Sequence, residues 1–523
     1  MKKTCLIVLL ALACAHASFA QTHNIKEFGA KGDGVADDTH ALLEGVKASR
    51  TLIIPYGTYN IKGLLSFAGI HDKTIIVQDN AIIRNTDNTK GTIYLNFSEN
   101  ITINGGTWTY LNLPTGNRTG AEHYFAFATC KNITITNIHL IGSSEMGISL
   151  VADIGCNISN NIIEQCFRDA IYSHYSSNLF YCCNYIHDIK DDAMSIHDYG
   201  IPAQRSALMS AGIPQSGNAI VFNNRTSNTY QGFASIGCTR LFIANNTFTN
   251  TVTGGIAISN NELLFKGTTA HASKITISNN TLSYIGGKPH IINNYFQNDN
   301  QMGTGRAAIF VGVTDENGTI NNPKSRITGV TINNNRVTNS HEDGAFVAEV
   351  DHLSFFGNTF TGNNTNRSAN TGATVEIRDC TAVSIDKNTV NDTRTGLLSN
   401  EMAYKVDHTN GVAGQWNLTG QSPHHVDNSA IQAATESSKD IPFSLDSFTL
   451  KPSEYKVIRK AFNPGMLTDY INLVAPASLG HKVICNACID PDDQSLIIIV
   501  SNTSRQPITI AKANWTVRAF YHN

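Results

Sequence analysis

Residues 161–197 read NIIEQCFRDAIYSHYSSNLFYCCNYIHDIKDDAMSIH, and this stretch repeats itself with a step of 23 residues. Asn161 corresponds to Asn184, and Asp169 corresponds to Asp192. Each asparagine ends an alternating apolar run, and each aspartate comes just before another run. A strand-turn-strand unit that repeats its turn residues at this spacing predicts a solenoid, whose coils stack about 4.8 Å apart.

The repeat extends in both directions along the chain. Asn137 and Asn224 end similar runs, so the steps between the four asparagines are 24, 23 and 40 residues. Asparagine at the same turn of each coil favours left-handed backbone and side-chain ladders, so we expect Asn161, Asn184 and Asn246 in one turn column. Further coils are predicted at RLFIANNTFTN (240–250), KITISNNTLS (274–283), GVTINNNRVTN (329–339), HLSFFGNTFTG (352–362) and VSIDKNTVND (383–392).

The sequence before the coils predicts a cap for the open end of the solenoid. Residues 28–39 read FGAKGDGVADDT, and Asp37 or Asp38 can cap the short helix that HALLEGVKAS predicts. This motif resembles the amino-terminal cap of the pectate-lyase-like right-handed parallel β-helix superfamily. The resemblance implies an all-β protein with a right-handed parallel β-helix and its cap over 21–402. It leaves the chemistry open, because the superfamily contains hydrolases, lyases, epimerases and phage spikes.

The first residues predict export. Lys2 and Lys3 precede a short apolar run, and Ser-Phe-Ala ends at Ala20, so we expect a signal peptide over 1–20 and a secreted or periplasmic protein. A lipid anchor at Cys14 is the alternative, while the apolar run is too short for a membrane span. The formal charge of −3 and the lack of a basic block argue against nucleic acid as a partner.

The pattern changes towards the end of the chain. Residues 440–523 have longer strands and predict a separate small β domain, and the polar stretch 403–439 predicts a linker or wrapping tail. The order ASLG (477–480), IDPDDQ (489–494), IIIVSNTS (497–504) and ITI (508–510) resembles the β-clip barrel of trimeric dUTPases. The nucleotide motifs of that family are absent, and Asp493 stands where it carries a tyrosine. The resemblance therefore implies a trimerisation or packing module, and with it a homotrimer.

An acidic column is the strongest candidate for chemistry. Eight residues after the aligned asparagines stand Glu145, Asp169 and Asp192, so we expect them on one face, with Asp191 beside the last. Stacked carboxylates repel one another, so a protein that only needed to fold would not collect them. Acid–base catalysis, cation binding and plain turn residues are the three interpretations, and Glu145 can be a substrate contact or a turn residue.

The acidic coils resemble two families of inverting glycoside hydrolases. FRDAI (167–171) and KDDAMSIH (190–197) resemble polygalacturonases, and the second segment is closer still to β-helix α-1,3-galactosidases. The resemblance implies that Asp192 is the general acid and that Asp169 and Asp191 hold and deprotonate the water. We expect no metal or cofactor in this site. The expected substrate-binding residues are Glu145, Arg168, Tyr172, His174, His197, Tyr230 and Gln231.

The departures from these families bear on the substrate. The Gly-His-Gly of polygalacturonases is replaced by Tyr-Gln-Gly-Phe at 230–233, and the following coils contain no Arg-x-Lys pair to bind a uronate. A neutral, α-galactoside-like sugar is therefore expected in a polysaccharide or oligosaccharide substrate. Insertions at 200–216 and 284–325 are expected to form binding walls.

Two other functions are compatible with the sequence. A polysaccharide lyase or epimerase of the same fold would need a base and a group that neutralises a carboxylate, and Arg168, Lys190, Arg205 and Arg225 are available. A non-catalytic, trimeric glycan-binding β-helix would need neither.

Overall fold

The computed structural model describes residues 22–116, 122–260, 269–287, 306–313, 325–367, 372–397 and, with short gaps, 401–522. The expected signal peptide, Cys14 and Asp493 lie outside these residues. Within the described part of the chain, no helix is long and apolar enough to cross a membrane.

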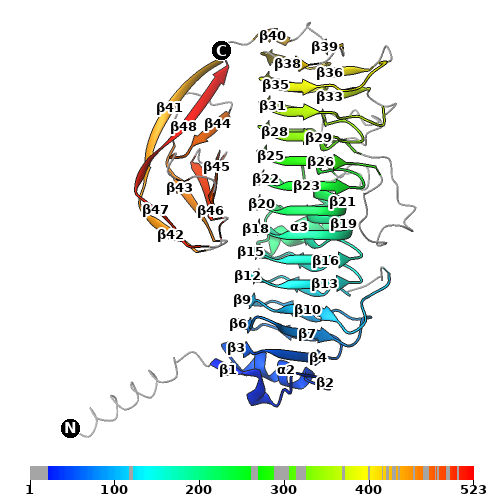
Figure 1. Cartoon of the computed structure of the whole chain (residues 1–523), viewed down its shortest axis with the longest axis vertical. Helices are drawn as coiled ribbons and strands as arrows, with labels where there is room; N and C mark the ends of the chain where they lie inside the picture. Colours follow the sequence, from blue (N-terminus) through cyan, green and yellow to red (C-terminus); the bar gives the residue numbers. More distant parts are fainter. Residues whose placement is uncertain are drawn as a thin grey trace, which may run out of the picture.

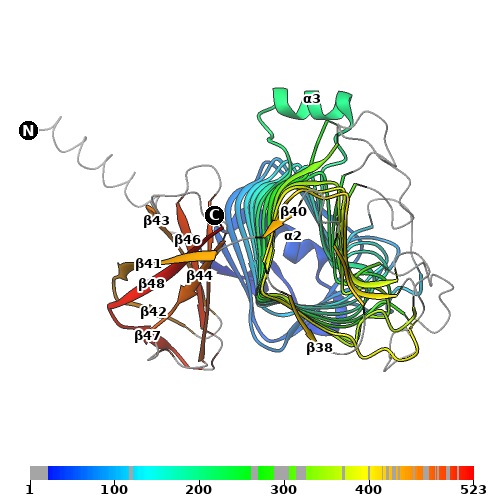
Figure 2. The same ribbon diagram turned by 90° about the horizontal axis from the view of Figure 1, so that it is seen from above.

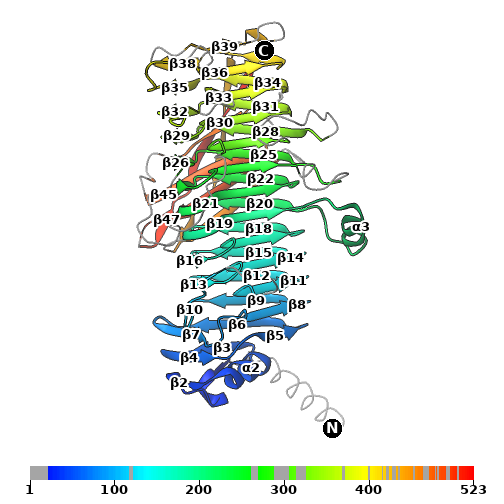
Figure 3. The same ribbon diagram turned by 90° about the vertical axis from the view of Figure 1, so that its right-hand side faces the viewer.

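The coils stack into a long parallel β-helix, which confirms the fold predicted from the repeat (Figure 1 and Figure 3). Its first sheet has 15 strands and the second has 25, and neighbouring strands within each run parallel. The strands of the first sheet, in stacking order, are β1 (Thr22–Asn24), β3 (Thr51–Ile54), β6 (His71–Val77), β9 (Glu99–Asn104), β12 (Lys131–Thr136), β15 (Ile154–Ser159), β18 (Ser177–Cys182), β20 (Gly217–Phe222), β22 (Thr239–Ala244), β25 (Ser273–Ser278), β28 (Ile327–Asn333), β31 (Val350–Phe356), β34 (Thr381–Asp386), β37 (Gly411–Ala413) and β40 (Ile431–Ala433).

Alternation within each strand sends one set of side chains into a continuous core. Ile135, Ile158, Tyr181, Val221 and Ile243 occupy the same position in successive coils, and each is fully buried. Burying one such aliphatic side chain stabilises the fold by about 1.5–3 kcal/mol. Identical spacing from coil to coil therefore builds a core along the whole axis.

Asparagines form a buried ladder at one corner, where their amides bond from coil to coil. Asn161 Nδ2 donates to Asn184 Oδ1 at 3.0 Å, and Asn184 Nδ2 donates to Asn224 Oδ1 at 2.9 Å. The ladder continues through Asn246, so the three asparagines predicted in one column do share it. The remaining members are Asn280, Asn335, Asn358 and Asn388.

The alignment of Asn137 with this column is wrong by one residue. Thr136 pairs with Ser159, so Asn137 matches Asn160, and Ile138 takes the ladder position below Asn161. Asn137 and Asn160 instead share a left-handed conformation, each with φ of 57°. Two consecutive turn positions that both favour asparagine cannot be told apart by composition.

The amino-terminal motif closes the open end of the solenoid. Helix α2 (Thr39–Ala48) buries Leu42 and Val46 against the first coil. The Asp37 carboxylate accepts the Thr39 N–H at 3.0 Å, while Asp38 accepts the N–H groups of the preceding glycine-rich loop. Both aspartates are thus used, one at the helix start and the other to hold the loop.

The stretch 403–439 differs from the expected linker. Strands β36 (Met402–Asp407), β38 (Trp416–Thr419) and β39 (His425–Val426) pair parallel to earlier coils, as do β37 and β40. The strands here are only two to six residues long, so period-two alternation is too short to read in the sequence.

The carboxy-terminal part forms antiparallel sheets beside the solenoid (Figure 1 and Figure 2). One sheet contains β41 (Glu436–Leu445), β48 (Ala513–His522) and β44 (Tyr470–Val474), and the other contains β43 (Tyr455–Lys460), β46 (Leu496–Asn502) and β45 (Val483–Ile489). Strands β42 (Phe448–Leu450) and β47 (Ile508–Ile510) form a short pair. The rings of Tyr455 and Phe180 stack at 4.0 Å, so this unit packs on the first sheet of the solenoid.

Candidate functional site

The second sheet carries the acidic residues. The strands that build this region are β13 (His139–Ser143), β14 (Ile148–Val151), β16 (Ile162–Cys166), β17 (Ile171–His174), β19 (Tyr185–His197) and β21 (Arg225–Ile236). Asp169 lies between β16 and β17, while Asp191 and Asp192 lie inside β19. The pairing of β19 with β21 shifts register between Ile189 and Asp192, and such an irregularity re-aims side chains at a corner.

The three aspartates lie together. Ile171 pairs with Met194, which sets Asp169 beside Asp192, and one carboxylate oxygen from each aspartate lies within 4.8 Å of the others. Asp169 and Asp192 are buried, while Asp191 is partly exposed. The sequence therefore identified a real cluster.

The placement of Glu145 below Asp169 is wrong. Ser143 pairs with Cys166 and Ile148 with Ile171, so Glu145 lies below Arg168 and Met146 lies below Asp169. The offset follows from the one-residue error at Asn137. Burial raises the pKa of the Glu145 carboxyl, and the nearby Arg168 charge opposes that shift.

Each aspartate has a different partner. The Arg168 guanidinium donates from Nε to Asp191 Oδ2 at 2.7 Å, and the Ser195 hydroxyl donates to Asp169 Oδ2. Burial raises the pKa of Asp192 well above its ordinary value, and the Asp169 charge adds to the shift. Burial and the Asp191 charge likewise raise the pKa of Asp169. The two buried carboxyls therefore tend to hold protons, while the third forms an ion pair with arginine.

A wall of aromatic and imidazole rings adjoins the acids on the same sheet. His174 pairs with His197 in the next coil, as predicted, and Tyr172 lies 5.6 Å from the His197 ring. Tyr199 completes the group, with its hydroxyl 3.0 Å from His197 Nδ1 and its ring 4.7 Å from His174.

Both imidazoles of this wall keep one nitrogen uncommitted. Nε2 of His174 and Nε2 of His197 are buried and have no hydrogen-bond partner among the residues that the structure describes. Burial lowers the pKa of His174 to about 4 and that of His197 to about 3, so both rings are neutral near pH 7. Buried polar atoms without partners are costly, and a ligand hydroxyl would satisfy them.

The coil above the acids contributes Tyr230 and Gln231. Gln231 pairs with Asp192 across the ladder and is buried, and burial also raises the pKa of Tyr230. Gln231 therefore continues the column of Asp192 in this coil. Its side-chain oxygen accepts from Arg306 Nη1 at 3.2 Å.

Arg306 and Ser195 are residues of this site that sequence reasoning missed. Arg306 lies within the 284–325 insertion that was expected to form a wall, and residues 288–305 and 314–324 of that insertion lie outside the described residues. The length of the insertion does not indicate which of its residues returns to the column. Its positive charge opposes the raised pKa of Asp192. Ser195 lies three residues after Asp192 in the apolar run MSIH. The sequence alone does not say whether its side chain points into the core or towards the aspartates.

The other insertion is anchored by a buried ion pair. It carries helix α3 (Pro202–Ser210), which projects from the solenoid in Figure 2. Arg205 Nη1 donates to Asp198 Oδ2 at 3.0 Å, and Tyr175 donates its hydroxyl to Gln204 at 2.7 Å. Arg205 is thus structural. Of the other three lyase candidates, Lys190 and Arg225 lie over aromatic rings, and Arg168 pairs with Asp191.

The sequence matches known proteins only distantly. No family model matches the chain. A curated relative, the preneck appendage protein of Bacillus phage PZA, is 28% identical over 201 residues, which cover 32% of this chain and 23% of the relative. The chain thus matches under a quarter of that relative's length.

Among solved structures, the A-module of mannuronan C-5 epimerase from Azotobacter vinelandii matches with a TM-score of 0.50 at 13% identity, over 79% of this chain and all of that module. An α-1,3-glucanase catalytic unit from Streptomyces thermodiastaticus matches with a TM-score of 0.48 at 14% identity, over 79% of this chain and 68% of that one. At such low identity the likeness to the epimerase module shows a shared parallel β-helix fold.

Proposed function

We propose that the protein is a carbohydrate-active enzyme, a glycoside hydrolase that cleaves at a neutral, α-galactoside-like sugar. The observation that carries the proposal is the cluster of Asp169, Asp191 and Asp192, in which two carboxyls are buried with raised pKa values beside one ion-paired carboxylate. Glycoside hydrolysis needs a proton donor and an ionised carboxylate at the same bond. Few structural roles would bring these three groups together without a bound ion.

The roles follow from burial and charge. Asp192 is the general acid, because burial and neighbouring acids favour its protonated form. Asp191, which Arg168 pairs at 2.7 Å, is the ionised carboxylate that deprotonates the attacking water, and Asp169 helps to hold that water in place. The neutral imidazoles of His174 and His197 and the ring of Tyr172 bind sugar hydroxyls and a sugar face.

We propose hydrolysis with inversion, and the argument for it is the third carboxyl group. Two acids can orient a water while the third protonates the leaving oxygen, and no covalent nucleophile is then needed. One carboxylate oxygen from each aspartate lies within 4.8 Å of the others, which is a distance between single oxygens, whereas the spacing of about 6.5–9.5 Å typical of inverting pairs joins whole carboxyl groups. The anomeric configuration of the first product is therefore the measurement that decides between inversion and retention.

A neutral sugar is proposed because the coils after the acidic cluster contain no Arg-x-Lys pair that would bind a uronate carboxylate. Of the two arginines near the acids, Arg168 is paired with Asp191. Arg306 donates to the neutral amide of Gln231 and keeps its charge, so cleavage of galacturonan in the test below would assign it to the sugar carboxylate.

Digestion of a glycan panel tests the reaction class. The panel contains neutral α-galactosides and galacturonan, and the products are identified by mass spectrometry, by absorbance near 232 nm and by early proton NMR of the anomeric signals. Hydrolysis of a neutral glycan with an inverted first product is expected. An unsaturated uronide would replace hydrolysis by elimination, while a retained anomer would overturn inversion alone.

Two variants link any turnover to the acidic cluster. Asp192→Asn removes the proposed acid, and Asp79→Asn changes an exposed turn aspartate of another coil. Turnover that persists in Asp192→Asn would contradict the assignment. Glycan binding without turnover in the unmodified protein would favour a binding protein instead.

A further inference from the structure

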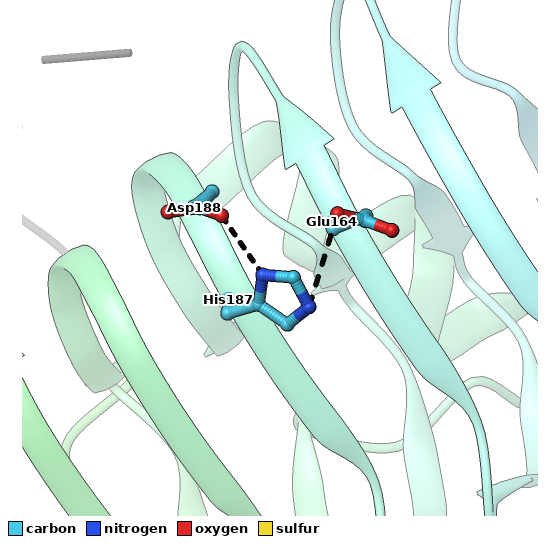
Figure 4. A group of neighbouring side chains, drawn as sticks. All are labelled: Glu164, His187 and Asp188. Atoms are coloured by element: carbon cyan, nitrogen blue, oxygen red, sulfur yellow. Dashed lines mark hydrogen bonds and ion pairs between the residues drawn. The ribbon is translucent and has the colours of Figure 1, made fainter. Parts of the chain in front are cut away.

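A second cluster of ionisable residues lies on three successive coils, next to the turn that leads to the acid pair. His139 lies in β13, Glu164 in β16 and His187 in β19, and Asp188 follows directly. Glu164 pairs with His187 across the parallel ladder. Figure 4 shows the His187 ring between the carboxylates of Glu164 and Asp188.

The contacts place a carboxylate at each nitrogen of His187. Nδ1 lies 2.9 Å from Asp188 Oδ2, and Nε2 lies 3.8 Å from Glu164 Oε2. The other oxygen of Glu164 lies 2.7 Å from His139 Nε2. One ligand atom from each of Glu164, His187 and Asp188 lies within 4.8 Å of the other two.

This arrangement is incomplete for a neutral imidazole. A neutral ring has one N–H and one lone pair, so one nitrogen of His187 would present a lone pair to a carboxylate oxygen. The two carboxylates carry a charge of −2, and in neutral form neither His187 nor His139 offsets it. A divalent cation would offset the whole charge and use the lone pair as a ligand.

The donor set selects the kind of ion. One imidazole nitrogen with two carboxylate oxygens suits zinc and similar divalent transition metals, whereas calcium and magnesium prefer oxygen ligands alone. Ligand atoms bound at about 2.0–2.2 Å lie under about 4.5 Å apart, so small rotations of the side chains suffice here.

We propose that Glu164, His187 and Asp188 form a binding site for a divalent transition-metal ion, with zinc as the representative. His139 orients the Glu164 carboxylate from the far side, as outer partners of metal ligands do. The ion ties the coil of Glu164 to the next coil, three residues before Asp191. The site is separate from the proposed catalytic cluster and does not depend on the proposed function.

The test uses full-length, tag-free protein stripped with a chelator and then dialysed against zinc at pH 7.5. Bound zinc is measured by mass spectrometry of the metal, and cobalt is added in parallel for its visible absorption. We expect one zinc ion per chain and a higher midpoint of thermal unfolding with zinc than without it. We also expect a visible absorption band typical of cobalt with few ligands. No retained zinc, or calcium retained in its place, would overturn the proposal.

Variants locate the ion. His187→Asn and Glu164→Gln each remove the bound zinc and the cobalt band, and far-UV circular dichroism checks that both variants fold. The control His408→Asn removes an exposed histidine that also faces an aspartate, at 3.6 Å from Asp379, and keeps the zinc. Asp169→Asn alters the other described acidic cluster and also keeps it. Zinc lost from Asp169→Asn but kept in folded His187→Asn would place the ion at the aspartates and reject this site.

Discussion

Two columns of this solenoid stack polar side chains from coil to coil, and they do so with opposite consequences. In the asparagine ladder, Asn184 donates to Asn224 and to the carbonyl of Ile158, both at 2.9 Å, and its oxygen accepts two hydrogen bonds from Asn161. In the acidic column, Asp169 and Asp192 are also stacked and buried, but an ionised carboxylate only accepts.

The difference is one of chemical complementarity. An amide carries donors and an acceptor, so identical residues satisfy one another, and each added coil repeats the same bonds. Ionised carboxylates repel one another, so this column is stabilised by other groups. Arg168 pairs with Asp191, the Ser195 hydroxyl donates to Asp169, and burial favours the protonated form of Asp192. The first column stabilises the fold, while the second holds carboxyl groups that the fold must support against their mutual repulsion.

The largest expected effect comes from making the acidic column more like the ladder. Asp192→Asn keeps the shape of the side chain but removes the transferable proton, so the hydrolytic rate should fall at least about 10²–10⁴-fold. The measurement is kcat/KM on the substrate found in the glycan panel. Asp79→Asn, on an exposed turn, should keep the full rate, and a drop of less than tenfold in Asp192→Asn would contradict the role.

The next effect comes from breaking the ladder. Asn246→Ala leaves the backbone N–H and the amide of Asn224 without their acceptor, and frees the carbonyl of Val221. We expect the free energy of unfolding to fall by about 2–4 kcal/mol, measured by chemical denaturation.

The matched control for the ladder is Asn137→Gly. Asn137 is exposed, has φ of 57°, and lies outside the buried column. Glycine tolerates this conformation, so the free energy should change by under about 1 kcal/mol. Equal losses in Asn246→Ala and Asn137→Gly would mean that the ladder has no special contribution.

A smaller effect concerns stability and pH. Because the pKa of Asp192 is raised by burial, the folded state binds a proton that the unfolded state releases above about pH 3.9. Stability is therefore lost as pH rises towards the folded pKa. Asp192→Asn carries no such proton, so it should gain about 1–3 kcal/mol over the unmodified protein at pH 8.5 and much less at pH 4. A difference that stays constant with pH would contradict the raised pKa.

The smallest effect is expected from Arg168→Gln. The positive charge of Arg168 lowers the pKa values of Asp169 and Asp192 against the larger effect of burial. Without it, the alkaline limb of the pH profile of kcat/KM should move upward by about 0.5–1 unit. Arg225→Gln, which removes a guanidinium 5.4 Å from the Tyr185 ring, should leave the limb in place. A shift to lower pH in Arg168→Gln would mean that the arginine does not act through these acids.

The sequence by itself determined the repeating coil, the ladder and the trio of aspartates. These are local features: alternation of apolar residues decides which side chains point inward, and a turn that needs left-handed backbone selects asparagine. The cap over 28–39 is local too, since its glycines and aspartates bond within a few residues.

Only the tertiary structure decided which turn positions stack on which. Register depends on the pairing of whole coils, so a shift of one residue moved Asn137 off the ladder and set Glu145 below Arg168. Contacts across insertions were equally hidden, because the length of a loop does not say where the chain returns, and Arg306 reaches Gln231 from 75 residues away. Glu164 and His187 meet for the same reason: stacking brings together residues that no local pattern relates.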